Sequence, residues 1–277
     1  MASVTQVEGW ADDCTSIAEI EEALLELRLR VGRGGVPDLR TSVLTHIAWV
    51  PEEWQAAATQ TLAGLGERHP SRTLLLFPAP EKEDALNARV FLECHPLHGD
   101  ARQLCNEVIE LRVEGTRSLA PASIVTPLLL PDLPVFLRWR GRPPFRTDQF
   151  RQMLELVDRL VVDSSEWPDV PGAYAELEEF FEVAAVSDIV WRRTLLWRRA
   201  LADEWPELPA RIAGPAAEAA LVAGWLRSRA AADIPVDVVD ELPFAPDADA
   251  SDLLSAELEV FGRDSVYEEA ARSAGRL

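Results

Sequence analysis

Four residues with metal-binding side chains lie close together in the chain: Cys94, His95, His98 and Cys105. Thiolate and imidazole groups are ligands that zinc prefers, and a structural zinc site takes four of them in a tetrahedron. The segment lacks the paired C-x-x-C spacing of compact zinc modules, so we expect a loop with incidental histidines between two strands. A disulfide between the two cysteines is geometrically possible, but in a reducing compartment we expect free thiols.

Motifs for nucleophilic or phosphate-transfer chemistry do not occur in the sequence. There is no G-x-S-x-G elbow and no G-x-x-x-x-G-K-[ST] loop, and the glycines of "VGRGGVP" (31–37) follow an expected helix instead of joining a strand to a helix. The abundant acids, for example Glu176, Glu178, Glu179 and Glu182, have the spacing of solvated helix faces. The sequence therefore predicts no catalytic residues, no cofactor and no enzymatic activity.

Two groups of arginine and tryptophan residues remain as candidates for binding. Guanidinium groups stack on aromatic rings and bind anions or acidic surfaces in a bidentate manner, and both residue types are common interface anchors. Buried tryptophans beside arginines that extend to the solvent would produce the same pattern without any ligand, so both interpretations stay open. The candidate contacts are Trp139, Arg140, Arg142 and Arg146 in the first group, and Trp191, Arg192, Trp197 and Arg198 in the second.

Composition and charge limit the partners that the chain can have. With 48% hydrophobic and 27% charged residues, the 277-residue chain has the composition of a globular protein and can bury a large core without disulfides or metal. Its formal net charge of −20 repels phosphate backbones and anionic lipids, so we expect neither nucleic acid nor a membrane as partner. The N-terminus has no basic segment followed by an apolar one, which predicts a cytoplasmic protein.

The elements that must position these residues begin with alternating helices and strands. A capping box at Ser16 and Glu19 starts an amphipathic helix in residues 16–31, and an extended segment (41–50) and a helix (51–66) follow. The run 71–78 predicts a strand buried on both faces, and 87–95 and 106–115 predict an antiparallel pair. A helix near 119–130, a strand at 134–139, a helix at 147–158 and a strand at 159–165 complete the alternation.

From Pro171 onward the strand signal disappears, and we expect helices joined by a proline-rich acidic linker near 232–250. The predicted fold class is α/β: a mixed β-sheet domain with flanking helices, followed by a mainly helical region. We expect an N-terminal helix and linker in 1–40, an α/β domain in 41–168 and a helical domain in 169–277.

Five stretches resemble, in order, the OpcA family of glucose-6-phosphate dehydrogenase assembly proteins. The most specific is "TPLLLPDLPVFLRWRGRPP" (126–144), in which a leucine-rich run precedes Pro-Asp-x-Pro, a strand and a tryptophan–glycine turn. The others are "HPSRTLLL" (69–76), "CNEVIELRVEG" (105–115), "SDIVWRRTLLWRRALA" (187–202) and "LLSAELEVFGRDSVYEEAAR" (253–272).

The resemblance implies a non-enzymatic protein that binds glucose-6-phosphate dehydrogenase and promotes its assembly or activity in the oxidative pentose phosphate pathway. An alternative is a regulatory sensor that binds a sugar phosphate in an arginine-lined cleft. Compared with the family, the region before the terminal helices is shortened. No cysteine follows Cys105, so we do not expect the thioredoxin control that involves C-terminal cysteines in cyanobacterial members.

Overall fold

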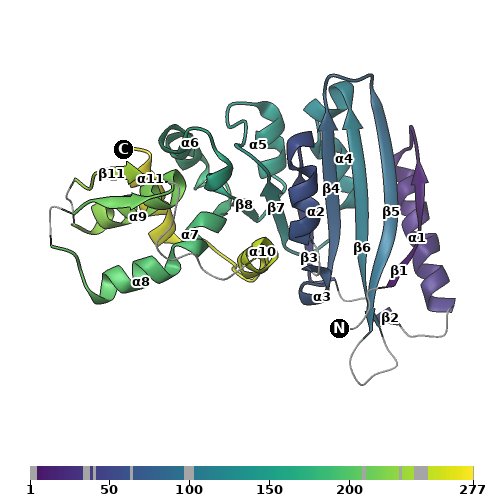
Figure 1. Ribbon diagram of the computed structural model, residues 1–277. Coiled ribbons are helices and arrows are strands. Elements are labelled where there is room, and N and C mark those ends of the chain that lie inside the picture. The colour runs from purple at the N-terminus through teal and green to yellow at the C-terminus, as the bar shows by residue number, and fades with distance from the viewer. Residues whose placement is uncertain are drawn as a thin grey trace. The chain divides into compact units, whose positions relative to one another are not determined.

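The computed structural model describes residues 5–33, 38–39, 42–62, 65–96, 103–207, 210–230, 233–239 and 249–276. The chain forms two compact units, of which the first comprises 1–138 and 146–158 and the second 139–145 and 159–277. The fold class is confirmed: a mixed sheet with flanking helices precedes a mainly helical region (Figure 1). In the described ranges, no helix is long and apolar enough to cross a membrane.

A twisted sheet organises the first unit (Figure 1). Its strands lie in the order β1 (Thr5–Asp12), β5 (Ala85–Pro96), β6 (Gln103–Glu114), β4 (Ser71–Ala79), β3 (Leu44–Trp49) and β7 (Val135–Trp139), with β2 (Asp38–Leu39) beside the start of β6. β3, β4 and β6 run parallel, whereas β5 is antiparallel to β6. The predicted antiparallel pair and the predicted buried strand β4 are therefore confirmed.

Strand β1 is an element that the sequence did not predict. It pairs antiparallel with β5, and its register shifts between Val7 and Trp10. A methyl group at Gly9 would approach the carbonyl oxygen of Val90 to 2.6 Å, so a side chain there would press on the neighbouring strand. The irregular pairing explains why the segment lacks the alternation by which a strand is recognised.

Helices cover both faces of this sheet. On one face η1 (Glu52–Trp54) and α2 (Gln55–Leu62) pack on a core that includes Ala48, Leu75 and Phe91, and α3 (Leu65–Arg68) follows. On the other lies α1 (Ile17–Arg33), which contacts β5 and β1. The capping box of α1 is confirmed, because Ser16 N donates to Glu19 Oε2 at 2.7 Å and Glu19 N donates to Ser16 Oγ at 3.4 Å.

The leucine-rich run forms short turns in place of the single helix expected near 119–130. The chain passes through η2 (Gly115–Leu119), α4 (Ala122–Val125) and η3 (Thr126–Leu128) before α5 (Asp148–Leu154) completes the unit. Pro127 lacks an N–H group and cannot continue the ladder of helical hydrogen bonds. Val125 and Leu128 are nonetheless fully buried, so the run contributes to the core, as its composition indicates.

The described residues of the second unit contain four short strands, of which the sequence predicted the first, in the segment 159–165, but not the other three. β8 (Arg159–Val162) and β9 (Ala185–Asp188) pair in parallel, as do β10 (Ile212–Gly214) and β11 (Val236–Val238). The expectation that strands end before Pro171 is therefore wrong. β9 lies in the region after Pro171, where we expected helices alone.

Helix α9 (Ala216–Ala230) forms the centre of the helical part. Its residues 217–226 are all buried, and it packs on α11 (Ser265–Ala274). A methyl group at Gly224 would come within 2.3 Å of the carbonyl oxygen of Ala270, so only glycine permits this close approach. The remaining helical segments are α6 (Val170–Leu177), α7 (Ile189–Arg193), α8 (Leu195–Asp203) and α10 (Ala250–Leu258), with η4 (Ser164–Glu166) and η5 (Glu178–Phe180).

Candidate functional site

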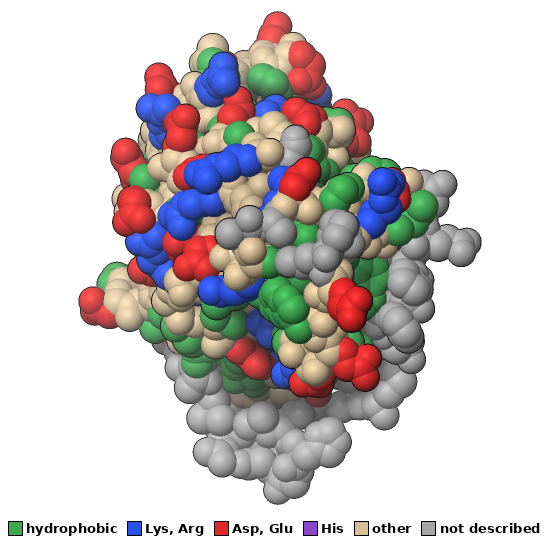
Figure 2. Space-filling model, turned by 90° about the vertical axis from the view of Figure 1, so that its left-hand side faces the viewer, with side chains coloured by type: hydrophobic (Ala, Val, Ile, Leu, Met, Phe, Trp, Pro, Cys, Tyr) green, Lys and Arg blue, Asp and Glu red, His purple; other side chains and the backbone are tan. Residues whose placement is uncertain are grey.

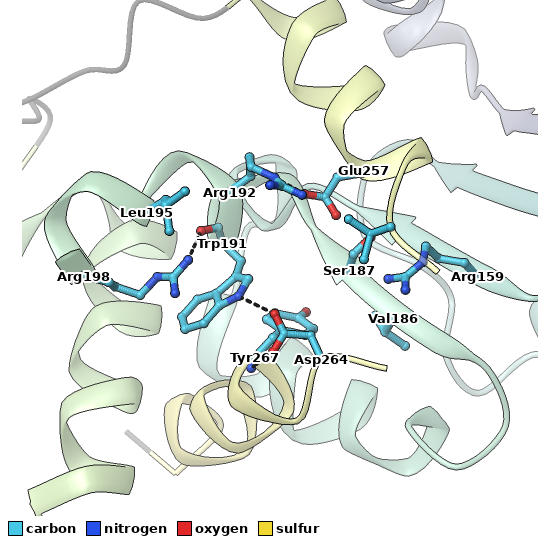
Figure 3. Close-up of a pocket in the computed structure, with 11 residues that line it drawn as sticks. Arg159, Val186, Ser187, Trp191, Arg192, Leu195, Arg198, Glu257, Asp264 and Tyr267 are labelled. Carbon is cyan, nitrogen blue, oxygen red and sulfur yellow. Dashed lines mark hydrogen bonds and ion pairs between the residues drawn. The ribbon is translucent and has the colours of Figure 1, made fainter. Parts of the chain in front are cut away.

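A cavity of about 180 Å³ in the second unit brings together polar and charged side chains from separate segments of the sequence. It lies among β8, β9, α7 and the two terminal helices (Figure 3). The residues that line it are Arg159, Val186, Ser187, Trp191, Arg192, Leu195, Arg198, Glu257, Val260, Asp264 and Tyr267.

Local structure explains how these side chains converge. Arg159 on β8 and Ser187 on β9 project from the same face of the parallel pair, because residues two apart on a strand share a face and Arg159 is opposite Ala185. Asp188 ends β9 and caps α7 through Val190 N at 2.9 Å, which starts the helix that carries Trp191 and Arg192. Asp264 caps α11 through Val266 N and Tyr267 N, both at 3.0 Å.

The two carboxylates at the cavity are already occupied by donors from the protein. Glu257 Oε1 accepts from Arg192 Nε at 2.8 Å, and Asp264 Oδ2 accepts from Trp191 Nε1 at 3.0 Å (Figure 3). Glu257 is buried, so its pairing with Arg192 offsets the free energy that desolvation of the charge costs. These contacts hold the rim of the cavity in a fixed arrangement.

The two other arginines have no carboxylate partner within the described part of the chain. Arg198 lies with its guanidinium 3.3 Å from the centroid of the Trp191 ring and donates to the Trp191 carbonyl oxygen at 2.8 Å. Arg159 is only 2% exposed, and its Nη2 donates to the carbonyl oxygen of Gly262. A fully buried arginine without an acid is rare, since burial of an uncompensated charge is costly.

Three buried polar atoms of this lining make no hydrogen bond at all to the described residues. They are Arg159 Nη1, Ser187 Oγ and Tyr267 Oη. A buried donor without an acceptor destabilises a protein by about 1–3 kcal/mol, so native structures rarely leave such groups together. All three atoms belong to residues that line the same cavity.

The protonation states of these groups make them donors at neutral pH. Burial lowers the pKa of Arg159, which Glu257 and Asp264 partly counteract, and burial lowers the pKa of Arg198 to about 10. Burial also raises the pKa of Tyr267 well above its usual value, and nearby carboxylates add to the effect. Arg198 therefore keeps its charge at neutral pH and Tyr267 keeps its proton.

The first predicted group of arginine and tryptophan residues does not form a basic surface. Trp139 is 2% exposed, and Arg140 is buried in an ion pair with Glu166 at 3.0 Å. Arg142 pairs with Glu176 at 2.5 Å and lies over Phe145, while Arg146 is exposed. For Trp139 and Arg140 the structure thus shows core packing.

The second group is divided between two places. Trp191, Arg192 and Arg198 line the cavity, whereas Trp197 lies along a separate apolar groove of about 370 Å³. The groove is formed by α8, β10 and α9, with Leu196, Leu201, Ile212 and Val222 beside Trp197. On the face of the molecule in Figure 2, hydrophobic side chains reach the surface between basic and acidic ones.

The cysteines form a disulfide, which corrects the expectation of free thiols. Cys94 and Cys105 are direct partners in the register of β5 and β6, with Cα atoms 4.1 Å apart, and a bond joins their sulfur atoms. The disulfide removes both thiolates from the zinc hypothesis, and the described residues include no group of three or more candidate ligands that could hold a metal ion. His98 lies outside the described residues, and Cys14 is free and exposed.

Sequence comparisons agree with the resemblance noted in the motifs. Residues 63–179 match a family model described as the glucose-6-phosphate dehydrogenase subunit N-terminal domain. An OxPP cycle protein OpcA of Nostoc punctiforme is 26% identical over 178 residues, which cover 58% of this chain and 38% of that protein. The OpcA of Synechococcus elongatus is 26% identical over 208 residues, which cover 69% of this chain and 43% of that protein. The chain is thus similar to OpcA proteins over the matched part of its length.

The family-model match covers little of the cavity. This chain spans about two fifths of the length of the curated OpcA relatives that it matches. The family-model match ends at residue 179, so of the cavity lining it includes Arg159 but not Ser187, Trp191 or Tyr267.

The sequence did not indicate five polar residues of this cavity. No single motif contains them, since Arg159 lies on β8, Ser187 on β9, Glu257 on α10, and Asp264 and Tyr267 at the start of α11. Arg159 is the first residue of a short strand, where an arginine is ordinarily exposed, and no motif distinguishes it. The only available signal was the second group of arginines and tryptophans, which did indicate Trp191, Arg192 and Arg198.

Proposed function

We propose that the chain is a non-catalytic protein that binds glucose-6-phosphate dehydrogenase and promotes its assembly or activity in the oxidative pentose phosphate pathway. The observation that carries this proposal is the match of residues 63–179 to a dehydrogenase subunit domain. The names of the OpcA relatives, which place those proteins in the OxPP cycle, support the same pathway.

We propose the apolar groove of α8, β10 and α9 as the surface that contacts the dehydrogenase. Trp197 and Leu201 line it, and Leu196 at its edge is 55% exposed. Exposed apolar side chains that lie together mark interaction sites more often than isolated ones do, and tryptophan is enriched among residues that dominate binding energy. Arg142, which is about one third exposed, and the exposed Arg146 remain further candidate contacts.

The test measures the activity of purified dehydrogenase from the same cell with increasing amounts of this protein. An activator must bind the active conformation more tightly than the inactive one, and a coupling of about 1–3 kcal/mol corresponds to a change of about 5- to 150-fold in apparent substrate affinity. We expect saturation at a fixed stoichiometry and co-elution of the two proteins in size-exclusion chromatography.

A matched pair of variants tests the surface. Leu196→Asp places a charge at the groove, whereas Leu25→Asp places one on α1, where Leu25 is 53% exposed compared with 55% for Leu196. Because both side chains are exposed, neither change should unfold the protein. We expect only Leu196→Asp to weaken co-elution. If both variants bind equally well, the groove is not the contact surface; a dehydrogenase that ignores the wild-type protein contradicts the proposed function itself.

A further inference from the structure

The cavity lined by Arg159, Ser187 and Tyr267 is built from hydrogen-bond donors that have no acceptor. Arg159 Nη1 can only donate, and the hydroxyl groups of Ser187 and Tyr267 each carry a proton that no described acceptor receives. The three residues are 2%, 6% and 0% exposed, in that order, so bulk solvent does not supply hydrogen-bond acceptors to these groups. A group that fills the cavity must therefore bring several acceptor oxygens.

Charge favours an anion over a neutral acceptor. Three arginines and two carboxylates line the cavity, so its formal charge is positive, although the whole chain carries −20. Glu257 accepts from Arg192, and Asp264 accepts from Trp191. Both carboxylates act on Arg159 through space, but neither forms an ion pair with Arg159 or Arg198, so the three arginines leave the lining with a net positive formal charge.

The volume of the cavity limits the size of a ligand that it can hold. At about 30 Å³ for each water molecule, a cavity of about 180 Å³ has room for roughly six waters. Pockets for larger, drug-sized ligands measure about 300–1,000 Å³, so a nucleotide does not fit. A phosphate group fits, either free or as the ester of a small metabolite.

We propose that this cavity binds the phosphate group of a small phosphorylated metabolite. Arg159 Nη1, Ser187 Oγ and Tyr267 Oη donate to the phosphate oxygens, and the Arg198 guanidinium adds positive charge from its place over the Trp191 ring (Figure 3). Charge-assisted hydrogen bonds to a phosphate are about twice as strong as neutral ones, which offsets the burial of Arg159. The inference goes beyond dehydrogenase binding and does not depend on it.

The test uses the full chain alone, without the dehydrogenase. Thermal melts and isothermal titration calorimetry are recorded with inorganic phosphate, with glucose 6-phosphate and with glucose. A ligand that binds only the folded state raises the melting temperature as its concentration exceeds the dissociation constant. We expect a rise with glucose 6-phosphate or with inorganic phosphate, and none with glucose. A response to inorganic phosphate alone identifies free phosphate as the ligand, and a stronger response to the ester identifies a sugar phosphate.

Two variants remove single donors and keep the shape of the site. Tyr267→Phe and Ser187→Ala should each weaken phosphate binding about tenfold or more, because each loses a hydrogen bond to a charged group. Without ligand neither variant should melt below the wild type, since the deleted hydroxyl groups have no partner in the protein.

Tyr174→Phe is the matched control for Tyr267→Phe. The Tyr174 hydroxyl is equally buried but lies 2.7 Å from Ser164 Oγ and 2.8 Å from Asp188 Oδ2, outside the cavity. We expect this control to melt at a lower temperature and to keep the full shift with phosphate. The proposal is overturned if neither phosphate compound shifts the wild-type melt, if glucose shifts it equally, or if Tyr267→Phe and Ser187→Ala keep the wild-type response.

Discussion

The side chain of Asp188 caps a helix although it is buried away from the solvent. Its carboxylate caps α7 and accepts hydrogen bonds from Ser164 N at 3.1 Å and Tyr174 Oη at 2.8 Å, yet it is fully buried. Burial, with a contribution from Asp163, raises the pKa of Asp188 from 3.8 to about 7 despite these hydrogen bonds. The folded protein therefore holds a proton that the unfolded chain releases near pH 4.

Stability at neutral pH should consequently respond to Asp188→Asn. A raised pKa in the folded state contributes stability that is present below about pH 4 and is lost as the pH rises toward about 7. Over this window the wild type should lose about 4 kcal/mol relative to Asp188→Asn, at 1.36 kcal/mol for each pKa unit. Urea unfolding of both proteins from pH 4 to pH 8 measures the difference.

The comparison with Asp188→Asn also removes the effect of His46. Burial, together with the charges of Arg138 and His69, lowers the pKa of His46 from 6.5 to about 3. His46 therefore contributes stability above pH 6.5 that is lost as the pH falls through this range toward 3, which opposes the trend from Asp188. Both proteins contain His46, so its contribution cancels in their difference. A difference that stays constant between pH 4 and pH 8 would contradict the raised pKa.

At the scale of residues, the sequence predicts chemical type better than environment. Three of the four candidate contacts in 191–198, Trp191, Arg192 and Arg198, line one cavity, and their role as binding residues stays a prediction. In 139–146, by contrast, Trp139 packs in the core and Arg140 pairs with Glu166. Arg159 was missed because its burial depends on Gly262, which lies 103 residues away in the chain.

The disulfide joins β5 and β6 of the hairpin. The length of the loop that the disulfide closes sets how much it stabilises the fold. Cys94 and Cys105 are separated by 11 residues, and a closed loop of this length limits the unfolded chain by about 3 kcal/mol in the chain-entropy model. Reduction, or the double change Cys94→Ala and Cys105→Ala, should lower the free energy of unfolding by up to this amount.

Alkylation with and without reductant measures the bond directly. The unfolded, unreduced protein should react at one thiol, Cys14, and the reduced protein at three. For the unfolding measurement, Cys14→Ser is the control. The exposed Cys14 has no sulfur partner, so its replacement should leave the free energy of unfolding unchanged. Three reactive thiols without reductant would show that the disulfide does not form.

At the scale of elements, long periodic patterns were predictable, and the short strands after Pro171 were not. α1 shows its capping box and helical spacing of apolar residues over 17 residues, and the hairpin strands are 12 residues long and alternate over part of their length, for example in 109–114. β9 has 4 residues and β10 has 3, which is too few for a period of two to stand out from a helix. These strands exist because a parallel partner completes their backbone hydrogen bonds, and the sequence of one segment does not show its partner.

At the scale of the whole molecule, the excess of acids must affect stability. The chain has 47 acidic and 27 basic residues, so 20 carboxylates cannot be matched by any cation of the protein. Repulsion among them destabilises the compact state, and it extends over the Debye length, which is about 30 Å at 0.01 M salt and about 10 Å at 0.1 M. Salt screens the attraction within ion pairs less than this repulsion, because paired charges such as Arg263 and Glu182 lie 2.8 Å apart, well within both Debye lengths.

We therefore expect sodium chloride to stabilise the isolated protein. Exposed ion pairs contribute only about 0–1 kcal/mol each, and their short range leaves them less screened than the long-range repulsion. Raising sodium chloride from about 0.01 M to about 0.1 M should increase the melting temperature by a few degrees. Chloride is the appropriate anion because phosphate or sulfate would add binding at the Arg159 cavity to the effect of screening. A melting temperature that falls with chloride would mean that attractive pairs, not the unmatched acids, dominate the electrostatic free energy of the fold.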